Sequence, residues 1–300
     1  MVRGLPALLA CLCLGACAPE APPPRAATAD PGRAGETGYI HHRPGELPII
    51  LSVPHDGALA PADIPDRTAG VTVRDSHARA LAEAIRDALA ARCGRAPHLV
   101  VCELSRKKVD CNRPLAEGAA DPAAARAWRD YHDALDAAER AVLARSPHGL
   151  YLDIHSHGHP KKRIEIGYLL KADDLRLPAA RLDADDTVAA RSSLRALSRR
   201  TPAKFSELLR GETSLGGLLV ARGVPAVPSP TEAPLPGEPY FNGAYDIAAH
   251  GSRDGGRLDA AQLEVPGMLR DTPEHRAATA RAIAEALEVY FERHFGTKLR

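Results

Sequence analysis

Two apolar segments of this chain end in the same way, and this shared ending constrains the fold more than any other feature. Residues 48–53, PIILSV, run almost directly into His55, and the apolar run 150–152 is followed by Asp153 and His155. Short continuous apolar runs are typical of strands buried on both faces, as in parallel sheets. Because α/β proteins usually keep their chemistry at the C-terminal ends of such strands, the two histidines predict a site at one edge of a buried sheet.

The segments that separate these strands have helical character. Leu81, Ile85 and Leu89 are four residues apart and predict a helix over 73–92, and an alanine-rich stretch predicts another over 123–145. Further strands are expected at 99–104, 163–170 and 258–265, and further helices at 205–222 and 273–295. This alternation indicates an α/β fold in which helices cover both faces of a mixed, largely parallel sheet.

The composition fits one domain of catalytic size and excludes several classes of partner. A chain of 300 residues with 45% apolar content can bury one sizeable core. Its 39 basic and 38 acidic residues leave a formal charge of +1, which provides no electrostatic footprint for nucleic acid. The sequence also lacks the long basic run that would favour an anionic membrane surface. We therefore expect the folded domain to recognise neither.

The first 17 residues are expected to be a bacterial lipoprotein signal peptide. Arg3 precedes an apolar run over 5–14 that is too short to span a bilayer. The ending LGAC resembles a lipobox, in which Cys17 becomes the lipidated first residue; ordinary cleavage or anchoring at another cysteine is the alternative. Residues 18–37 are rich in Pro, Ala and Gly and predict a disordered tether, which leaves 38–300 as a single domain. We therefore expect a periplasmic or cell-envelope lipoprotein that meets the membrane only through its lipid.

Three cysteines remain in the predicted domain: Cys93, Cys102 and Cys111. An exported protein could pair two of them, and the odd number leaves at least one free or otherwise engaged. A Cys93–Cys102 disulfide would join the end of a helix to the following strand, but the spacing alone does not decide the pairing. The spacing also differs from that of a zinc site made of thiolates.

The histidines at the two strand ends predict a metal site. A catalytic zinc ion typically takes three protein ligands from His and carboxylates and leaves a position for water. His55 and His155 would supply two ligands, and either Asp75 or His77, at a predicted helix start, the third. His157 and His159 are read as loop residues rather than further ligands. Asp110 and Asp153 have two equal interpretations: they act in the chemistry, or they orient neighbours, since a carboxylate commonly accepts the second N–H of a metal-binding histidine.

A series of short motifs resembles the N-formylglutamate amidohydrolase family in order and spacing. These motifs are SVPHDG (52–57), DSH (75–77), SR (105–106), VDCNRP (109–114), DIHS (153–156), YFNGAY (240–245), HG (250–251) and QLE (262–264). The similarity covers about residues 46–295, with a divergent middle from about 171 to 235. The resemblance implies the zinc-dependent exopeptidase-like fold, a three-layer α/β/α sandwich.

The resemblance also implies roles for individual residues. It implies that His55, Asp75 and His155 hold Zn²⁺ and that Glu264 is the catalytic carboxylate. A bound zinc ion lowers the pKa of water to about 7 and polarises an amide carbonyl. Glu264 would take the proton of that water as general base and pass it to the leaving nitrogen.

The same resemblance places substrate-binding groups around the predicted metal. Arg113, with Asn112, matches a pair that grips a substrate carboxylate, which an arginine can bind through two parallel hydrogen bonds. Arg106 and Tyr245 are candidates to hold the substrate or to stabilise the oxyanion. The expected partner is therefore a small molecule or short peptide with a free carboxylate.

Three functions remain open from the sequence. The first is a zinc-dependent amidohydrolase that cleaves an N-acyl amino acid or a similar substrate. The second is a carboxypeptidase-like metallopeptidase that acts on peptides or peptidoglycan stems and would need an open groove beyond the metal. The third is a non-catalytic zinc-binding lipoprotein. Because the segment 171–235 diverges where substrate-facing loops are expected, formylglutamate itself is not inferred as the substrate.

Overall fold

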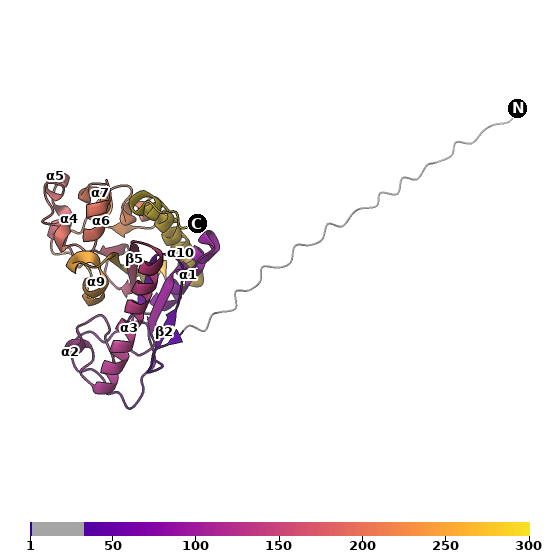
Figure 1. Ribbon diagram of the computed structural model, residues 1–300, viewed down its shortest axis with the longest axis vertical. Helices are drawn as coiled ribbons and strands as arrows, with labels where there is room; N and C mark the ends of the chain where they lie inside the picture. The colour runs from indigo at the N-terminus through magenta and orange to yellow at the C-terminus, as the bar shows by residue number, and fades with distance from the viewer. Residues whose placement is uncertain (2–32) are drawn as a thin grey trace. The chain divides into compact units, whose positions relative to one another are not determined.

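The computed structural model describes Met1 and residues 33–300 (Figure 1). The predicted signal peptide and Cys17 therefore lie outside the described residues, as does the predicted tether up to residue 32. The last residues of that predicted tether are instead part of the fold, because Arg33 and Ala34 pair with the following strand and Thr37 N donates to Asp130 Oδ2 at 2.6 Å.

The centre of the domain is a sheet of eight strands in the order β1-β2-β4-β3-β5-β8-β6-β7. The strands are β1 (Arg33–Ala34), β2 (Ile40–Arg43), β3 (Ile49–Val53), β4 (His98–Cys102), β5 (Gly149–His157), β6 (Ile164–Gly167), β7 (Ala226–Val227) and β8 (Leu258–Pro266). The middle strands β4, β3, β5 and β8 are parallel, whereas β2 joins β4 and β6 joins β8 in antiparallel pairing. The prediction of a mixed, largely parallel sheet is confirmed.

Helices cover both faces of this sheet. On one face, the helices α1 (Ala78–Cys93) and α10 (Pro273–Tyr290) lie side by side over one apolar core, as Figure 1 also shows. On the other face, α3 (Pro122–Arg145) and α9 (Tyr245–His250) enclose a second, smaller core. The remaining α-helices of the described residues are α2 (Leu115–Gly118), α4 (Ala172–Arg176), α5 (Ala179–Leu182), α6 (Arg195–Arg200), α7 (Phe205–Arg210) and α8 (Leu215–Val220). The predicted α/β/α sandwich is thereby confirmed.

The alternation of side chains along the strands explains the two cores. In β5, Leu150, Leu152 and Ile154 face the α1–α10 core, whereas Tyr151 faces the α3 core. The intervening positions on the α3 side become polar toward the C-terminal end of the strand, where Asp153 and His155 follow Tyr151. The same change occurs at Ser52 in β3 and at Gln262 and Glu264 in β8. The strands are therefore apolar along the face toward α1 and α10, whereas the face toward α3 is apolar at first and becomes polar at the C-terminal ends of β3, β5 and β8.

Several predicted boundaries differ from the structure. The strand predicted from the apolar run 150–152 extends from Gly149 to His157, because alternating side chains of either polarity suit an extended backbone that is paired on both sides. The helix predicted over 73–92 starts only at Ala78. The helix predicted over 205–222 is two helices, α7 and α8, separated near Gly211, where a Cβ would meet the Glu207 carboxylate at 1.9 Å. Cys93, Cys102 and Cys111 are all buried and free.

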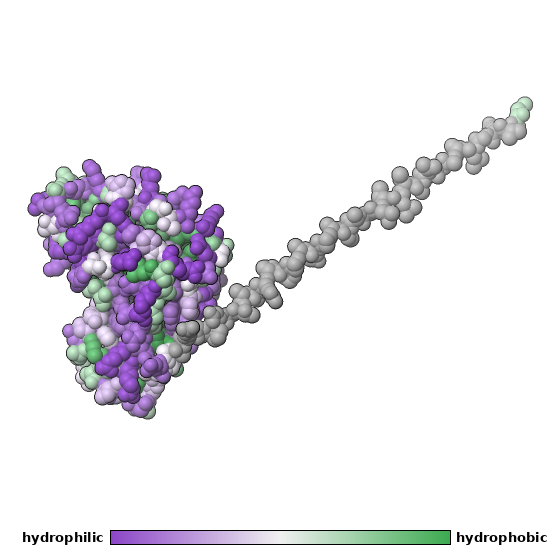
Figure 2. Space-filling model, in the orientation of Figure 1, coloured by the Kyte–Doolittle hydropathy of each residue, from purple (hydrophilic) through white to green (hydrophobic). Residues whose placement is uncertain are grey.

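The surface carries no large apolar patch on the face seen in Figure 2, where polar residues dominate and apolar residues form small separate groups. Among the described residues, no helix is both long enough and apolar enough to cross a membrane.

Candidate metal centre

Three elements bring the proposed ligands together at one edge of the sheet. His55 follows β3, His155 lies near the end of β5, and the two strands are parallel neighbours with Ser52 opposite Asp153. Asp75 belongs to the segment before α1, and its backbone N–H donates to the His55 carbonyl at 3.0 Å. All three side chains are buried. The residues that the sequence separates by up to 100 positions therefore meet in one place.

The ligand atoms of these three residues have the spacing of a metal site. One nitrogen or oxygen from each of His55, Asp75 and His155 lies within 4.8 Å of the others. Asp75 Oδ2 is 2.9 Å from His155 Nδ1 and 3.7 Å from His55 Nδ1. Both histidines thus present the same nitrogen, Nδ1, to the one carboxylate. A single divalent cation can be shared by such a group.

The opposite nitrogen of each imidazole is held by a second carboxylate. His55 Nε2 donates to Asp110 Oδ1 at 2.7 Å, and His155 Nε2 donates to Asp153 Oδ2 at 2.6 Å. A carboxylate cannot donate, so each Nε2 carries its hydrogen and each Nδ1 is left as the coordinating atom. This carboxylate–histidine arrangement fixes the tautomer and orientation of metal-binding imidazoles.

The electrostatics of the site fit a cation. Burial by itself would raise the pKa of Asp75, but the hydrogen bonds and charges of His155 and His55 hold it well below its usual range. His155 shows the converse: burial opposes its protonation, yet Asp153 and Asp75 raise its pKa well above the ordinary value. His55 Nδ1 is buried without a hydrogen-bond partner. A divalent ion would satisfy that nitrogen and replace the extra proton on His155.

Glu264 lies beside this group on the adjacent strand. His155 and Glu264 are opposite each other in the parallel β5–β8 pair, so their side chains leave the same face of the sheet one strand spacing apart. Gln262 Nε2 donates to Glu264 Oε1 at 2.6 Å, while Oε2 is buried without a partner. Burial raises the pKa of Glu264 to about 8. A carboxylate with one free oxygen and a pKa near neutral can exchange protons at physiological pH.

Arg106 contacts the acidic groups of the site. Its Nε donates to Asp110 Oδ2 at 3.1 Å, and its Nη1 lies 3.6 Å from Asp75 Oδ1. Asp110, although buried, is held well below its usual pKa, because the hydrogen bond and charge of His55 and the charge of Arg106 outweigh the effect of burial. Arg106 therefore offsets the negative charge of two carboxylates around the imidazoles.

The side chain of Asn112 makes hydrogen bonds to other residues of the protein. Its Nδ2 donates to Asp153 Oδ2 at 3.3 Å and lies 3.1 Å from His155 Nε2, and its Oδ1 accepts from Asp246 N at 2.8 Å. Asn112 thus joins β5 to the start of α9 and helps to position His155.

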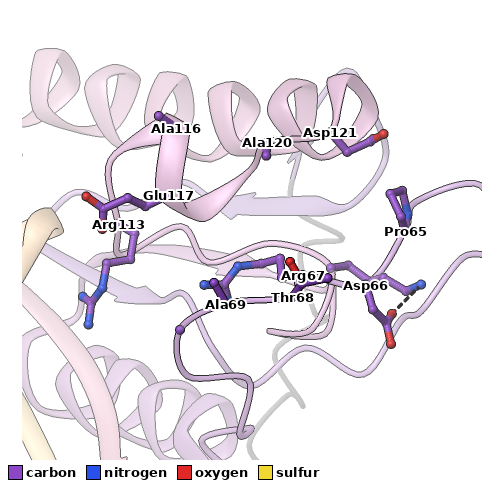
Figure 3. Close-up of a pocket in the computed structure, with 12 residues that line it drawn as sticks. Pro65, Asp66, Arg67, Thr68, Ala69, Arg113, Ala116, Glu117, Ala120 and Asp121 are labelled. Atoms are coloured by element: carbon purple, nitrogen blue, oxygen red, sulfur yellow. Dashed lines mark ion pairs between the residues drawn. The ribbon is translucent and has the colours of Figure 1, made fainter.

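Arg113 lies at a neighbouring pocket. Its Nη1 donates to the Asn112 carbonyl at 2.8 Å, and its own carbonyl accepts from Trp128 Nε1 at 2.9 Å. Figure 3 shows its guanidinium projecting from the segment between Asn112 and α2, in a pocket of about 450 Å³ that Arg67 also lines. Arg67 Nη1 is 3.6 Å from Asp110 Oδ2, so the pocket adjoins the carboxylate that holds His55.

The other predicted residues lie elsewhere. His77 is exposed and has a left-handed backbone, with φ of 66°, immediately before α1, so the structure brings Asp75 rather than His77 into the group. Tyr245 begins α9 and packs with its ring 5.9 Å from Trp128 and 5.6 Å from His132. His157 and His159 form a separate cluster with Glu165.

Two buried polar residues of the site were not predicted. Ser52 Oγ donates to Asp153 Oδ1 at 2.6 Å, and Gln262 holds Glu264. Each is a polar residue between apolar neighbours in a buried strand. Because a buried polar side chain needs a partner, this position in the sequence could have indicated a role in the site.

Replacing Asp110 by Asn is expected to weaken metal binding about 10- to 100-fold, because outer-shell partners of metal-binding histidines contribute about that much. The matched control is Asp66→Asn, which removes an acid whose side chain is 60% exposed and paired with Lys108. Zn²⁺ titration against a competing chelator measures both variants. Equal affinity of D110N and the wild type would show that His55 does not coordinate through the arrangement described.

Comparison with known proteins agrees with this fold. No protein-family model and no curated protein matches the sequence. Among solved structures, the crystal structure of N-formylglutamate amidohydrolase from Ralstonia eutropha JMP134 matches with a TM-score of 0.53 and 17% identity, over 86% of this chain and 99% of that one. A gene product of Agrobacterium tumefaciens gives a TM-score of 0.47 and 17% identity, over 83% and 93% of the two chains. The protein is thus an α/β/α protein with a buried two-histidine, one-aspartate group. Its fold is that of the amidohydrolase structure, as the resemblance implied.

Proposed function

We propose that this protein is a zinc-dependent amidohydrolase that cleaves an amide bond in an N-acyl amino acid or a similar carboxylate-bearing substrate. The observation that carries the proposal is the group of His55, Asp75 and His155, with both Nδ1 atoms turned toward one carboxylate and both Nε2 atoms held by others. Similarity of fold to an amidohydrolase structure supports the reaction class.

The three side chains would hold Zn²⁺, which when bound supplies Lewis acidity to a water molecule and to a carbonyl oxygen. Asp110 and Asp153 keep the two imidazoles in the required tautomer. Arg106 would offset the negative charge of Asp75 and Asp110 and so help to hold the metal ligands in place. It would also stabilise the oxyanion that forms during hydrolysis.

Glu264 would act as the general base and then as the general acid. Its Oε2 is available because only Oε1 is engaged, by Gln262. In the hydrolytic step, Oε2 would take a proton from the attacking water as the water oxygen bonds to the amide carbon; the C–N bond then breaks, and the same proton passes to the leaving nitrogen. The raised pKa of Glu264, about 8, suits both directions of transfer.

Arg113 would bind the free carboxylate of the substrate from the neighbouring pocket. One of its N–H groups donates to the Asn112 carbonyl, which ties the guanidinium to the residue that positions His155. Trp128 links Arg113 to the ring of Tyr245, so Tyr245 would contact the substrate on the Arg113 side. In this proposal, Asn112 orients the site through its hydrogen bonds.

We also propose that the protein is exported and anchored to the cell envelope through Cys17. The support is the short apolar run at residues 5–14 and the LGAC ending. An anchored enzyme of this kind would act on acylated amino acids or short peptides outside the cytoplasm.

A panel of N-acyl amino acids and short peptides, offered to zinc-loaded and chelator-treated protein, tests the reaction. We expect metal-dependent release of the free amino acid, with C-terminal carboxamide analogues cleaved about 10- to 100-fold less efficiently, since a hydrogen bond to a charged group contributes about 1.5–3 kcal/mol. Arg113→Gln should abolish that preference mainly through KM, whereas Arg126→Gln, an exposed arginine of α3, should retain it.

The panel also separates the alternatives. Preference for longer peptides over acyl amino acids would favour the alternative that the protein is a carboxypeptidase-like metallopeptidase. Stoichiometric zinc binding without turnover on any member would support a non-catalytic zinc-binding protein and overturn the proposed reaction.

A further inference from the structure

A second group of metal-ligating side chains lies between α3 and α9 and shares no residue with the site above. It consists of Asp136 and Glu139, one turn apart on α3, and His250 at the end of α9. Their ligand atoms lie within 4.8 Å of one another, and His250 Nδ1 is 3.4 Å from Asp136 Oδ1. The His250 side chain is 9% exposed, whereas that of Asp136 is 50% exposed, so the group opens to solvent on one side.

The hydrogen bonds behind His250 determine which of its nitrogens carries a hydrogen. His132 Nε2 lies 3.1 Å from the Cys111 carbonyl oxygen, which can only accept, so this nitrogen is the donor. With its hydrogen on Nε2, a neutral His132 ring has only a lone pair at Nδ1, so Nδ1 is an acceptor. His250 Nε2, at 2.8 Å from that Nδ1, must therefore be the donor of the next hydrogen bond.

It follows that a neutral His250 has its lone pair on Nδ1, turned toward a carboxylate. The nearest other acid to His132, Asp246, does not change this assignment. Its Oδ1 is 3.9 Å from His132 Nε2, too far for a hydrogen bond. Asp136 Oδ1 lies 3.4 Å from this nitrogen, so a positive charge between the two atoms stabilises them, either a second proton on His250 or a metal cation.

We propose that Asp136, Glu139 and His250 bind a divalent transition-metal cation such as Zn²⁺ or Mn²⁺. One imidazole with two carboxylates is a donor set for these ions, whereas Mg²⁺ and Ca²⁺ prefer oxygen ligands alone. The half-exposed Asp136 leaves room for water in the remaining positions. His132 would be the outer partner that fixes the His250 tautomer, as carboxylates and carbonyls do in other metal sites.

The site would join α9 to α3 and, through His132, to the carbonyl of Cys111. That carbonyl lies between Asp110 and Asn112, the residues that hold His55 and position His155. Occupancy of the second site would thus stabilise the segment that supports the proposed metal centre.

The test is the number of Zn²⁺ ions bound per chain, measured by equilibrium dialysis, in the wild type and in the Asp136→Asn, Glu139→Gln double variant. We expect two ions per chain in the wild type and one in the double variant. The affinity of the second site for Zn²⁺ should be at least about tenfold weaker in the double variant than in the wild type. Asp133→Asn is the matched control, because it removes an exposed acid from the same helix and should leave both ions bound.

A variant without the first centre makes the result independent of the proposed function. In His155→Ala, one ion should remain bound, and the double substitution should remove it. The single tryptophan reports on this site directly, because the ring centroids of Trp128 and His132 are 3.9 Å apart. Co²⁺ should quench its fluorescence in H155A but not after the double substitution.

Two outcomes would overturn the inference. The first is a wild type whose zinc stoichiometry is unchanged by the double substitution. The second is an H155A protein, folded by circular dichroism, that binds no Zn²⁺ and shows no Co²⁺ quenching; His250 would then hold a proton at Nδ1. If the wild type binds one ion that only the double substitution removes, the second site is real and the proposed catalytic zinc centre is not.

Discussion

Glu264→Gln is expected to lower kcat about 100- to 10,000-fold while the protein still binds Zn²⁺ with the wild-type stoichiometry. The substitution keeps the size of the side chain and removes the oxygen that accepts a proton, and general acid–base catalysis contributes rate effects of this size. Gln262 already holds Oε1, so the amide can keep its place in the strand. Turnover on the best substrate of the panel, together with zinc titration, measures both properties.

The matched control is Glu165→Gln, which changes the residue opposite Glu264 in the β6–β8 pair. Glu165 already accepts hydrogen bonds from His159 Nδ1 and from Phe241 N, so we expect a loss of less than about tenfold. If E264Q retained turnover, or if E165Q lost as much, Glu264 would not be the proton carrier.

His155→Ala is expected to abolish zinc binding at the first centre, and hydrolysis with it. The affinity should fall by more than the roughly 100-fold that loss of an outer-shell partner costs. The truncation also leaves Asp75 and Asp153 facing each other across a cavity without the imidazole that separates them, so its metal-free form should be less stable than the wild type. Zinc titration and thermal unfolding measure the two effects.

His159→Ala serves as the comparison, since His159 lies only four residues further along the same segment. Its ring stacks on Phe241 at 4.6 Å and its Nδ1 contacts Glu165, so it belongs to another cluster. Retained zinc binding in H159A is expected. Loss of one bound ion in H159A but of none in H155A would instead place the first metal centre at His157, His159 and Glu165.

Much of the fold could be predicted because its signals are local. The runs PIILSV and LYL have the length and composition of buried strands, and Leu81, Ile85 and Leu89 have helical spacing, so each segment carries its own pattern. Boundaries were less predictable. The sequence pattern placed the start of a helix near residue 73, but the chain makes a left-handed turn at His77 before α1 begins.

The third metal ligand could not be predicted from local sequence patterns. Asp75 and His77 are two residues apart, and both side chains can bind zinc, so their spacing in the sequence does not choose between them. The tertiary structure separates them because the Asp75 N–H binds the His55 carbonyl, which turns its carboxylate inward, while His77 is exposed at the helix start.

The sequence by itself determined the central strands β3, β4, β5, β6 and β8, the long helices α1, α3 and α10, and the polar residues at the strand ends, because apolar periodicity and residue chemistry are properties of short segments. Only the tertiary structure decided that β3, β5 and β8 are neighbours, and that His55, Asp75, His155 and Glu264 consequently lie at one edge of the sheet. Strand order depends on how the two apolar cores pack against α1, α10 and α3, and that packing is shared among residues far apart in the chain.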